Sequence, residues 1–194
     1  MVPIIVIVVI IVVLALYVIS LYNGLIGLKN KIENAWAQID VQLKRRYDLI
    51  PNLVETVKGY ATHERETLDA VITARNVAMT QQGGPQEQAQ AENVISGALK
   101  SVFALSEAYP DLKANQNFLN LQEELSGTEG RIAYARQFYN DTVVRFNTKI
   151  EKFPGNLIAG RLGFKPREYF EVDEASRGNV QVDFGTNPPP APSA

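Results

Sequence analysis

The amino-acid sequence predicts an all-α protein, in which a single N-terminal transmembrane helix precedes an antiparallel four-helix bundle and an extended C-terminal tail. Three observations support this. The first 22 residues carry no charged side chain, the following segments repeat apolar residues at helical spacing, and no convincing strand alternation precedes Arg167. We therefore divide the 194 residues into an N-terminal transmembrane anchor (1–22), a cytoplasmic helical bundle (23–154) and an extended or partly disordered tail (155–194).

The N-terminal segment is apolar enough to cross a membrane. From Ile4 to Ile19, every residue except Ala15 and Tyr17 is Val, Ile or Leu. Each such residue contributes roughly −0.3 to −0.6 kcal/mol at the membrane centre, so together they favour insertion by about 4 to 8 kcal/mol. A cleaved signal peptide would need a positive leading region and a good cleavage site, and this segment has neither. We expect a retained anchor.

Cations next to the span predict its orientation. No Lys or Arg precedes it, whereas Lys29, Lys31 and residues 44–46 follow it. The positive-inside rule places the N-terminus outside and the body in the cytoplasm, at a bacterial inner membrane. Because no other apolar run approaches 18 residues, we expect a single-pass protein whose first partner is the lipid bilayer.

The segment after the anchor has one apolar stripe and predicts a helix that continues to about Arg46. The stripe consists of Leu25, Leu28, Ile32, Ala35, Ile39 and Leu43, with Trp36 beside it. Residues 44–51 then resemble a helix boundary, because three cations suit a helix C-terminus, Asp48 can cap a new helix and Pro51 is tolerated in its first turn. The alternative is a proline kink in one continuous helix. We favour a chain reversal, because both flanking helices need a partner for their stripes.

Three further helices are predicted over about residues 49–80, 86–108 and 114–152, separated by turns that contain Gly or Pro. Short turns favour an antiparallel bundle, and we prefer a self-contained bundle to an oligomeric coiled coil. Beyond Pro154, residues 169–172 and 180–184 fit either short strands or an extended tail that binds a groove, and residues 188–192 fit a disordered end.

The composition and motifs favour a protein that is not an enzyme. The net charge of −2 argues against nucleic-acid binding, and the absence of cysteine excludes thiolate chemistry. The only histidine, His63, is followed by Glu64, but Thr67 stands where a zinc motif needs a second histidine. No phosphate-binding loop or nucleophile elbow is present, so we expect no cofactor and no catalytic or metal-binding residue.

A polar cluster around the predicted reversal is the strongest candidate for partner binding. It comprises Lys44, Arg45, Arg46, Asp48, Asn52 and Glu55. One interpretation is structural: the cations compensate the helix dipole and the polar residues fix the turn. The other is a docking epitope at the membrane-distal tip, about 37 Å beyond Tyr22 at 1.5 Å per residue. We interpret four aromatic residues, Tyr60, Tyr134, Phe138 and Tyr139, as core or staple residues.

The sequence from Tyr22 to Pro154 closely resembles the LemA family. The resemblance rests on residues 22–23, 35–36, 39–46, 48–54 and 57–60, of which the run RRYDLIPNLV is the most specific, and continues through 63–64, 74–75, 109–110, 112–114, 123–125, 133–136, 138–140 and 153–154. It implies a helical bundle behind a membrane anchor and no established enzymatic activity. Relatives in magnetosome membranes imply a role in organising membranes or membrane complexes.

Three functional hypotheses follow. The first is a non-enzymatic scaffold or adaptor whose cytoplasmic bundle binds a membrane-associated protein or a second copy of itself. The second is an accessory or regulatory subunit of a membrane enzyme such as a protease. The third is a homo-oligomer that shapes the membrane. An anchor concentrates all of these at the bilayer, where modest interfaces suffice.

Overall fold

The computed structural model describes residues 1–171, and over this range the chain is helical without any strand. The helices are α1 (Val2–Lys58), α2 (Arg65–Thr80), α3 (Pro85–Leu105), α4 (Pro110–Lys113), α5 (Gln116–Glu151) and α6 (Gly155–Ala159). The predicted all-α class with an apolar N-terminal helix is therefore confirmed.

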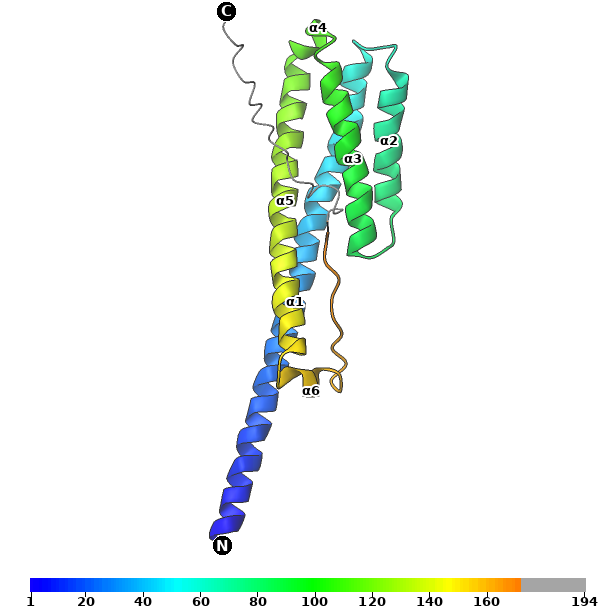
Figure 1. Ribbon diagram of the computed structural model, residues 1–194. Coiled ribbons are helices and arrows are strands. Elements are labelled where there is room, and N and C mark those ends of the chain that lie inside the picture. Colours follow the sequence, from blue (N-terminus) through cyan, green and yellow to red (C-terminus); the bar gives the residue numbers. More distant parts are fainter. Residues whose placement is uncertain (172–194) are drawn as a thin grey trace, which may run out of the picture.

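Helix α1 joins the candidate membrane span to the body without a break. Its first part projects from the rest of the molecule as an isolated rod (Figure 1), and the apolar side chains there are exposed. From Leu21 onward one face of the same helix is buried. The apolar span and the first helix of the body thus share one axis.

The predicted chain reversal at residues 44–51 is wrong, because α1 continues through Pro51 to Lys58. Proline has no N–H, so the carbonyl of Tyr47, one turn earlier, loses its helical donor. Arg75 of α2 replaces that donor, since its Nε lies 2.7 Å from the Tyr47 oxygen. The buried stripe also continues on the same face through Ile50, Leu53 and Val57, so no reversal is needed to bury it.

The chain turns instead at residues 59–64, so the helix predicted over about residues 49–80 is wrong at its start: residues 49–58 belong to α1, and α2 begins at Arg65. The third and fourth predicted helices begin close to their expected positions, at Pro85 and Gln116. Pro85 and Pro110 occupy the first turns of α3 and α4, where a missing N–H costs little. The side chain of Asn115 caps α5 by accepting a hydrogen bond from the Phe118 N–H at 3.0 Å.

Helices α1 and α5 run in opposite directions along the length of the body (Figure 1). Lys149 lies against Gly24, the rings of Trp36 and Tyr139 are 5.6 Å apart, and Arg45 pairs with Glu124 at 2.9 Å. The α2–α3 hairpin packs against the part of this pair farthest from the N-terminus.

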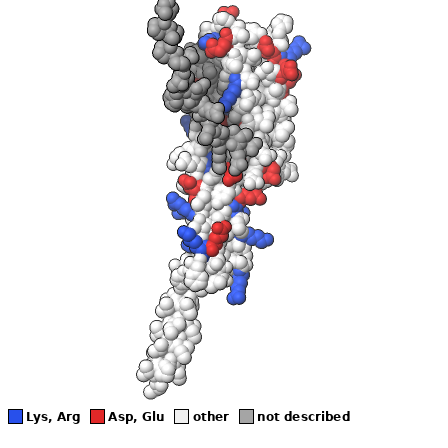
Figure 2. Space-filling view, viewed as in Figure 1, with Lys and Arg blue, Asp and Glu red and all other residues white. Residues whose placement is uncertain are grey.

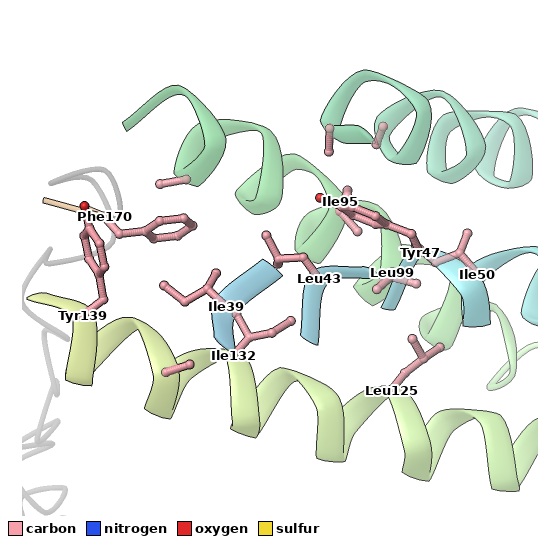
Figure 3. Packing of buried hydrophobic residues seen from close by; sticks show 14 of the residues in the cluster. Ile39, Leu43, Tyr47, Ile50, Ile95, Leu99, Leu125, Ile132, Tyr139 and Phe170 are labelled. Atoms are coloured by element: carbon pink, nitrogen blue, oxygen red, sulfur yellow. The ribbon is translucent and has the colours of Figure 1, made fainter. Parts of the chain in front are cut away.

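The core lies between α1, α3 and α5. Figure 3 shows Ile39 and Leu43 of α1 between Ile132 of α5 and Ile95 of α3. Tyr139 and Phe170 close the same core at its end nearer the membrane span. Burial of these apolar side chains is the main force that holds the helices together.

The chain after α5 folds back along the body as an ordered segment. Beyond α6, the side chain of Asn147 donates to the Arg167 carbonyl and accepts from its N–H, at 2.9 and 2.8 Å. Asn140 makes the same pair of bonds with Phe170, at 3.0 and 2.8 Å. The first part of the predicted tail is thus a short helix and a packed extended segment. The predictions for residues 180–184 and 188–192 lie outside the described residues.

Candidate functional site: a buried ion-pair cluster and an open groove

The core of the body contains an ion-pair cluster centred on Arg46. Its guanidinium donates hydrogen bonds to the carboxylates of Glu92 in α3 and Glu129 in α5, and to Ser96 Oγ at 3.1 Å. The hydroxyl of Tyr47 donates to Glu92 as well. Gln88 Nε2 donates to the same Glu92 oxygen, Oε1, at 2.7 Å, whereas Arg46 donates to Oε2. One arginine therefore links three helices.

Burial shifts the pKa of two side chains in and beside the cluster. Burial, together with the hydrogen bond to Glu92, raises the pKa of Tyr47 far above its ordinary value, so its hydroxyl stays protonated. Burial also lowers the pKa of Arg136, an effect that the nearby charge of Glu129 opposes. The Arg136 guanidinium stacks over the ring of Phe170, 4.6 Å from its centroid.

This cluster is suited to holding helices together rather than to chemistry on a substrate. Arg46 and Glu92 are each only 1% exposed, and both oxygens of the Glu92 carboxylate accept protein donors. A substrate could reach neither group without displacing the core. Within residues 1–171, no group of three or more His, Cys, Asp or Glu side chains is placed to bind a metal ion.

The structure separates the six predicted partner-binding residues. Arg46 points into the core, whereas Lys44, Arg45, Asp48, Asn52 and Glu55 are exposed. The interpretation that these polar residues fix a turn is wrong, because α1 has no turn there. Arg45 pairs instead with Glu124 of α5, and Glu55 lies 3.8 Å from Lys58. Arg46 also lies well below the tip, since α1 continues for 12 residues beyond it to Lys58, whereas Glu55 is within one turn of that end.

An open groove of about 610 Å³ lies between α1 and α5. It is lined by Ala37, Gln38, Val41 and Gln42 of α1 and by Gly127, Gly130, Arg131, Tyr134 and Ala135 of α5. Val41 is 62% exposed and Tyr134 is 73% exposed. Apart from the neighbouring backbone of α5 itself, no atom lies within 4 Å of the position that a Cβ would occupy on either glycine, so another backbone could approach closely.

Charged side chains close one end of this groove. Arg45, Glu123, Glu124 and Arg131 surround an adjoining pocket of about 490 Å³. A mostly apolar groove that ends in charges is suited to an amphipathic protein segment.

Sequence reasoning missed this groove because it assigned the aromatic residues of α5 to the core. Tyr139 is indeed buried, but Tyr134 and Phe138 are exposed. The available signal was a second stripe on α5, formed by Gly127, Gly130 and Tyr134 at three- and four-residue spacing.

Comparison with known proteins identifies the family. The model of the LemA family matches residues 35–184. Protein LemA of Metamycoplasma hominis is 30% identical over 164 residues, which cover 82% of this chain and 73% of that protein. Magnetosome protein MamQ 2 of Paramagnetospirillum magneticum is 25% identical over 179 residues, covering 79% of this chain and 66% of that protein. Magnetosome protein MamQ of Magnetospirillum gryphiswaldense is 24% identical over the same length and shares.

None of these names denotes an enzyme. Together with the apolar N-terminal helix, the family match indicates a membrane-associated protein. The extent of the family match and the identity to protein LemA establish that this chain belongs to the LemA family.

Proposed function

We propose that this protein is a membrane-anchored scaffold or adaptor, whose α1–α5 groove binds a helix of another membrane-associated protein. The observation that carries the proposal is the exposed groove with Val41 and Tyr134 on its two walls. Exposed apolar side chains around a concave surface are typical of interaction sites. The body works as an antiparallel four-helix bundle on the cytoplasmic side of a bacterial inner membrane.

A helix fits the groove better than an extended segment does. Gly127 and Gly130 are one turn apart on α5 and leave room for a helix backbone to approach. Arg131 lines both the groove and its charged end, so we expect a carboxylate on the incoming helix to face it. Because the anchor confines both proteins to one surface, a small interface is sufficient.

Photo-crosslinking in native membranes tests the proposal. The crosslinking amino acid is placed at position 41 or 134 in the groove, or at position 94 on α3 as a control. Val94 is a matched control because it is 61% exposed, close to the 62% of Val41. We expect one foreign protein to crosslink from both groove positions, through residues of a helix, and not from position 94.

Crosslinks to a second copy of the chain would overturn the assignment of a foreign partner and favour self-association. A single crosslinked membrane enzyme, such as a protease, would favour the accessory-subunit hypothesis within the same groove. Equal products from position 94, or none from the groove, would contradict the proposal.

A paired set of substitutions separates binding from folding. Val41→Glu should abolish the crosslink from position 134, because a charge would be buried in the interface. Val94→Glu should leave that crosslink unchanged. Circular dichroism should show equal helicity for the two variants, since both positions face solvent.

A further inference from the structure

The base of the body, where α1 leaves its apolar span, carries a second apolar surface. Helix α6 lies there across the direction of α1 and α5 (Figure 1). Phe153 and Leu157 are 78% and 60% exposed, and Leu162 is exposed too. Three large apolar side chains gathered on one short segment indicate an interaction surface.

This surface lies at the level where a bilayer would end. The helix from Val2 to Tyr22 is about 32 Å long at 1.5 Å per residue, which matches the roughly 30 Å hydrocarbon core. Tyr22 is therefore at the interface, where tyrosine is enriched. Its ring lies 5.8 Å from the ring of Phe164, which in turn lies 6.2 Å from Phe146 of α5. These aromatic contacts hold the segment after α6 at the same depth.

The turn that leads into α6 is sterically restricted. A Cβ on Gly155 would collide with the backbone carbonyl of Lys149, so only glycine permits this close approach. The exposed side chains of α6 are therefore presented from the end of α5 by a tightly packed turn.

Cations surround the same surface. A cleft of about 550 Å³ is lined by Lys29, Lys165 and Arg167, together with the apolar walls of Tyr22, Ile26, Phe146, Leu162 and Phe164. Lys152 and Arg161 are exposed on either side of α6. Figure 2 shows Lys and Arg around the base of the body, directly above the uncharged rod.

Few acids offset these cations. Glu33 lies 3.9 Å from Lys29 and 4.0 Å from Arg167, at the outer limit of an ion pair. Glu151 is exposed at the end of α5, and Glu168 lies next to Gly84 of the α2–α3 turn. The base of the body therefore presents an excess of positive charge beside exposed apolar side chains.

We propose that residues 152–167 form a second membrane contact that binds an anionic phospholipid. The lipid phosphate occupies the cleft between Lys29, Lys165 and Arg167, and Phe153, Leu157 and Leu162 enter the boundary between headgroups and acyl chains. A bilayer lipid, rather than a soluble anion, is the ligand, because the cations adjoin apolar side chains that would otherwise be exposed to water. This inference goes beyond the scaffold role and does not use the α1–α5 groove.

Depth measurement by spin labelling tests the apolar part. The chain has no cysteine, so Leu157→Cys and the control Val94→Cys each give one label site in the full-length protein. The proteins are placed in nanodiscs that contain phosphatidylglycerol, and the collisions of each label with oxygen and with a water-soluble nickel complex are measured. We expect the label at 157 to report the membrane interface and the label at 94 to report water. Equal exposure of both labels to the nickel complex would overturn the proposal.

Titration with a short-chain phosphatidylglycerol tests the cationic part, using full-length protein in neutral detergent. The double variant Lys165→Gln with Arg167→Gln should weaken binding about 25-fold, because each lost cation weakens it about fivefold. The matched control, Lys44→Gln with Lys58→Gln, removes two exposed cations far from the cleft and should leave the affinity unchanged. Equal affinity in both double variants would overturn the proposal. Inorganic phosphate that bound as tightly as the lipid would overturn the assignment of a lipid ligand.

These outcomes are independent of the scaffold proposal. The cleft variants leave Val41 and Tyr134 intact, so the groove crosslinks should persist when lipid binding is lost. Loss of crosslinks in Val41→Glu should conversely leave lipid affinity unchanged.

Discussion

Arg46 shows how neighbouring residues of the same charge acquire different roles from their positions on a helix. Arg45 is exposed and pairs with a surface glutamate, whereas Arg46 is among the largest fully buried side chains of the described chain. A surface ion pair contributes little stability, because water already solvates both charges. A buried charge without its partner is costly, because nothing replaces the lost water.

We therefore expect Arg46→Ala to lower the free energy of unfolding by about 3 to 5 kcal/mol, because it leaves Glu92 buried without its cation. Arg45→Ala, the control, should cost less than about 1 kcal/mol. Denaturant unfolding of full-length protein in detergent, followed by circular dichroism, measures both values. Replacing Arg46 and Glu92 together by Met should cost less than Arg46→Ala alone. Similar values for the Arg45 and Arg46 variants would contradict a structural role for the buried pair.

The position of Arg46 could have been inferred from the sequence. The buried stripe of α1 includes Ile39, Leu43, Arg46, Ile50 and Leu53, at spacings of three and four residues. Arg46 therefore occupies a core position, while Lys44 and Arg45 do not. Its partners Glu92 and Glu129 could not have been named, because they lie 46 and 83 residues away along the chain.

At the scale of helices, α1 shows that a proline within a helical pattern does not by itself end the helix. Pro51 removes the donor for the Tyr47 carbonyl, and Arg75 supplies another one from α2. Arg75 lies 28 positions after Tyr47 in the sequence, so this replacement donor is a tertiary contact. Local rules for helix termini therefore predicted a helix end near Pro51, whereas the tertiary contact from Arg75 allows the helix to continue.

This arrangement predicts that the effects of Pro51 and Arg75 are coupled. Arg75→Met should lower the free energy of unfolding by about 1 to 3 kcal/mol, because the Tyr47 carbonyl is left without a donor. In a Pro51→Ala background, the alanine N–H restores the helical bond, and the same substitution should cost less. The measurement is a double-mutant cycle by denaturant unfolding. Equal costs in both backgrounds would show that Arg75 acts elsewhere.

The bounds of α3 and α5 were predicted closely because their ends carry local chemistry, whereas the start of α2 at Arg65 was missed. Proline at 85 and 110 and the Asn115 cap act within one turn of the residues that they affect. Individual faces were less predictable: Val94 and Ile95 are adjacent apolar residues of α3, but they face different directions and only Ile95 is buried. Which face of a helix is buried depends on where the other helices pack, and the sequence of one helix does not show this. The α1–α5 groove was missed for that reason.

At the scale of the whole molecule, the continuous α1 sets how far the body extends from the membrane. From Tyr22 to Lys58 the helix rises about 54 Å at 1.5 Å per residue, whereas a reversal near Tyr47 would have limited the body to about 37 Å. The turn at residues 59–64, which follows α1, therefore lies at the end of the body far from the lipid.

This height can be measured by energy transfer in nanodiscs. A donor dye at Thr62→Cys should transfer energy weakly to acceptor dyes on lipid headgroups, because it lies more than about 50 Å from the surface. A donor at Asn30→Cys, about 12 Å above Tyr22, is the positive control. Transfer from position 62 that indicates about 35 Å would contradict a straight helix from span to tip.

A single unbroken helix also couples the lipid-embedded end to the far end of the molecule as a lever. Membrane helices tilt by about 20° on average, and over 54 Å that angle moves the tip sideways by about 20 Å. One molecule could then search a disc about 40 Å wide without diffusing in the bilayer. Bilayer thickness, which influences tilt, would thereby affect how far from its own anchor the tip can reach.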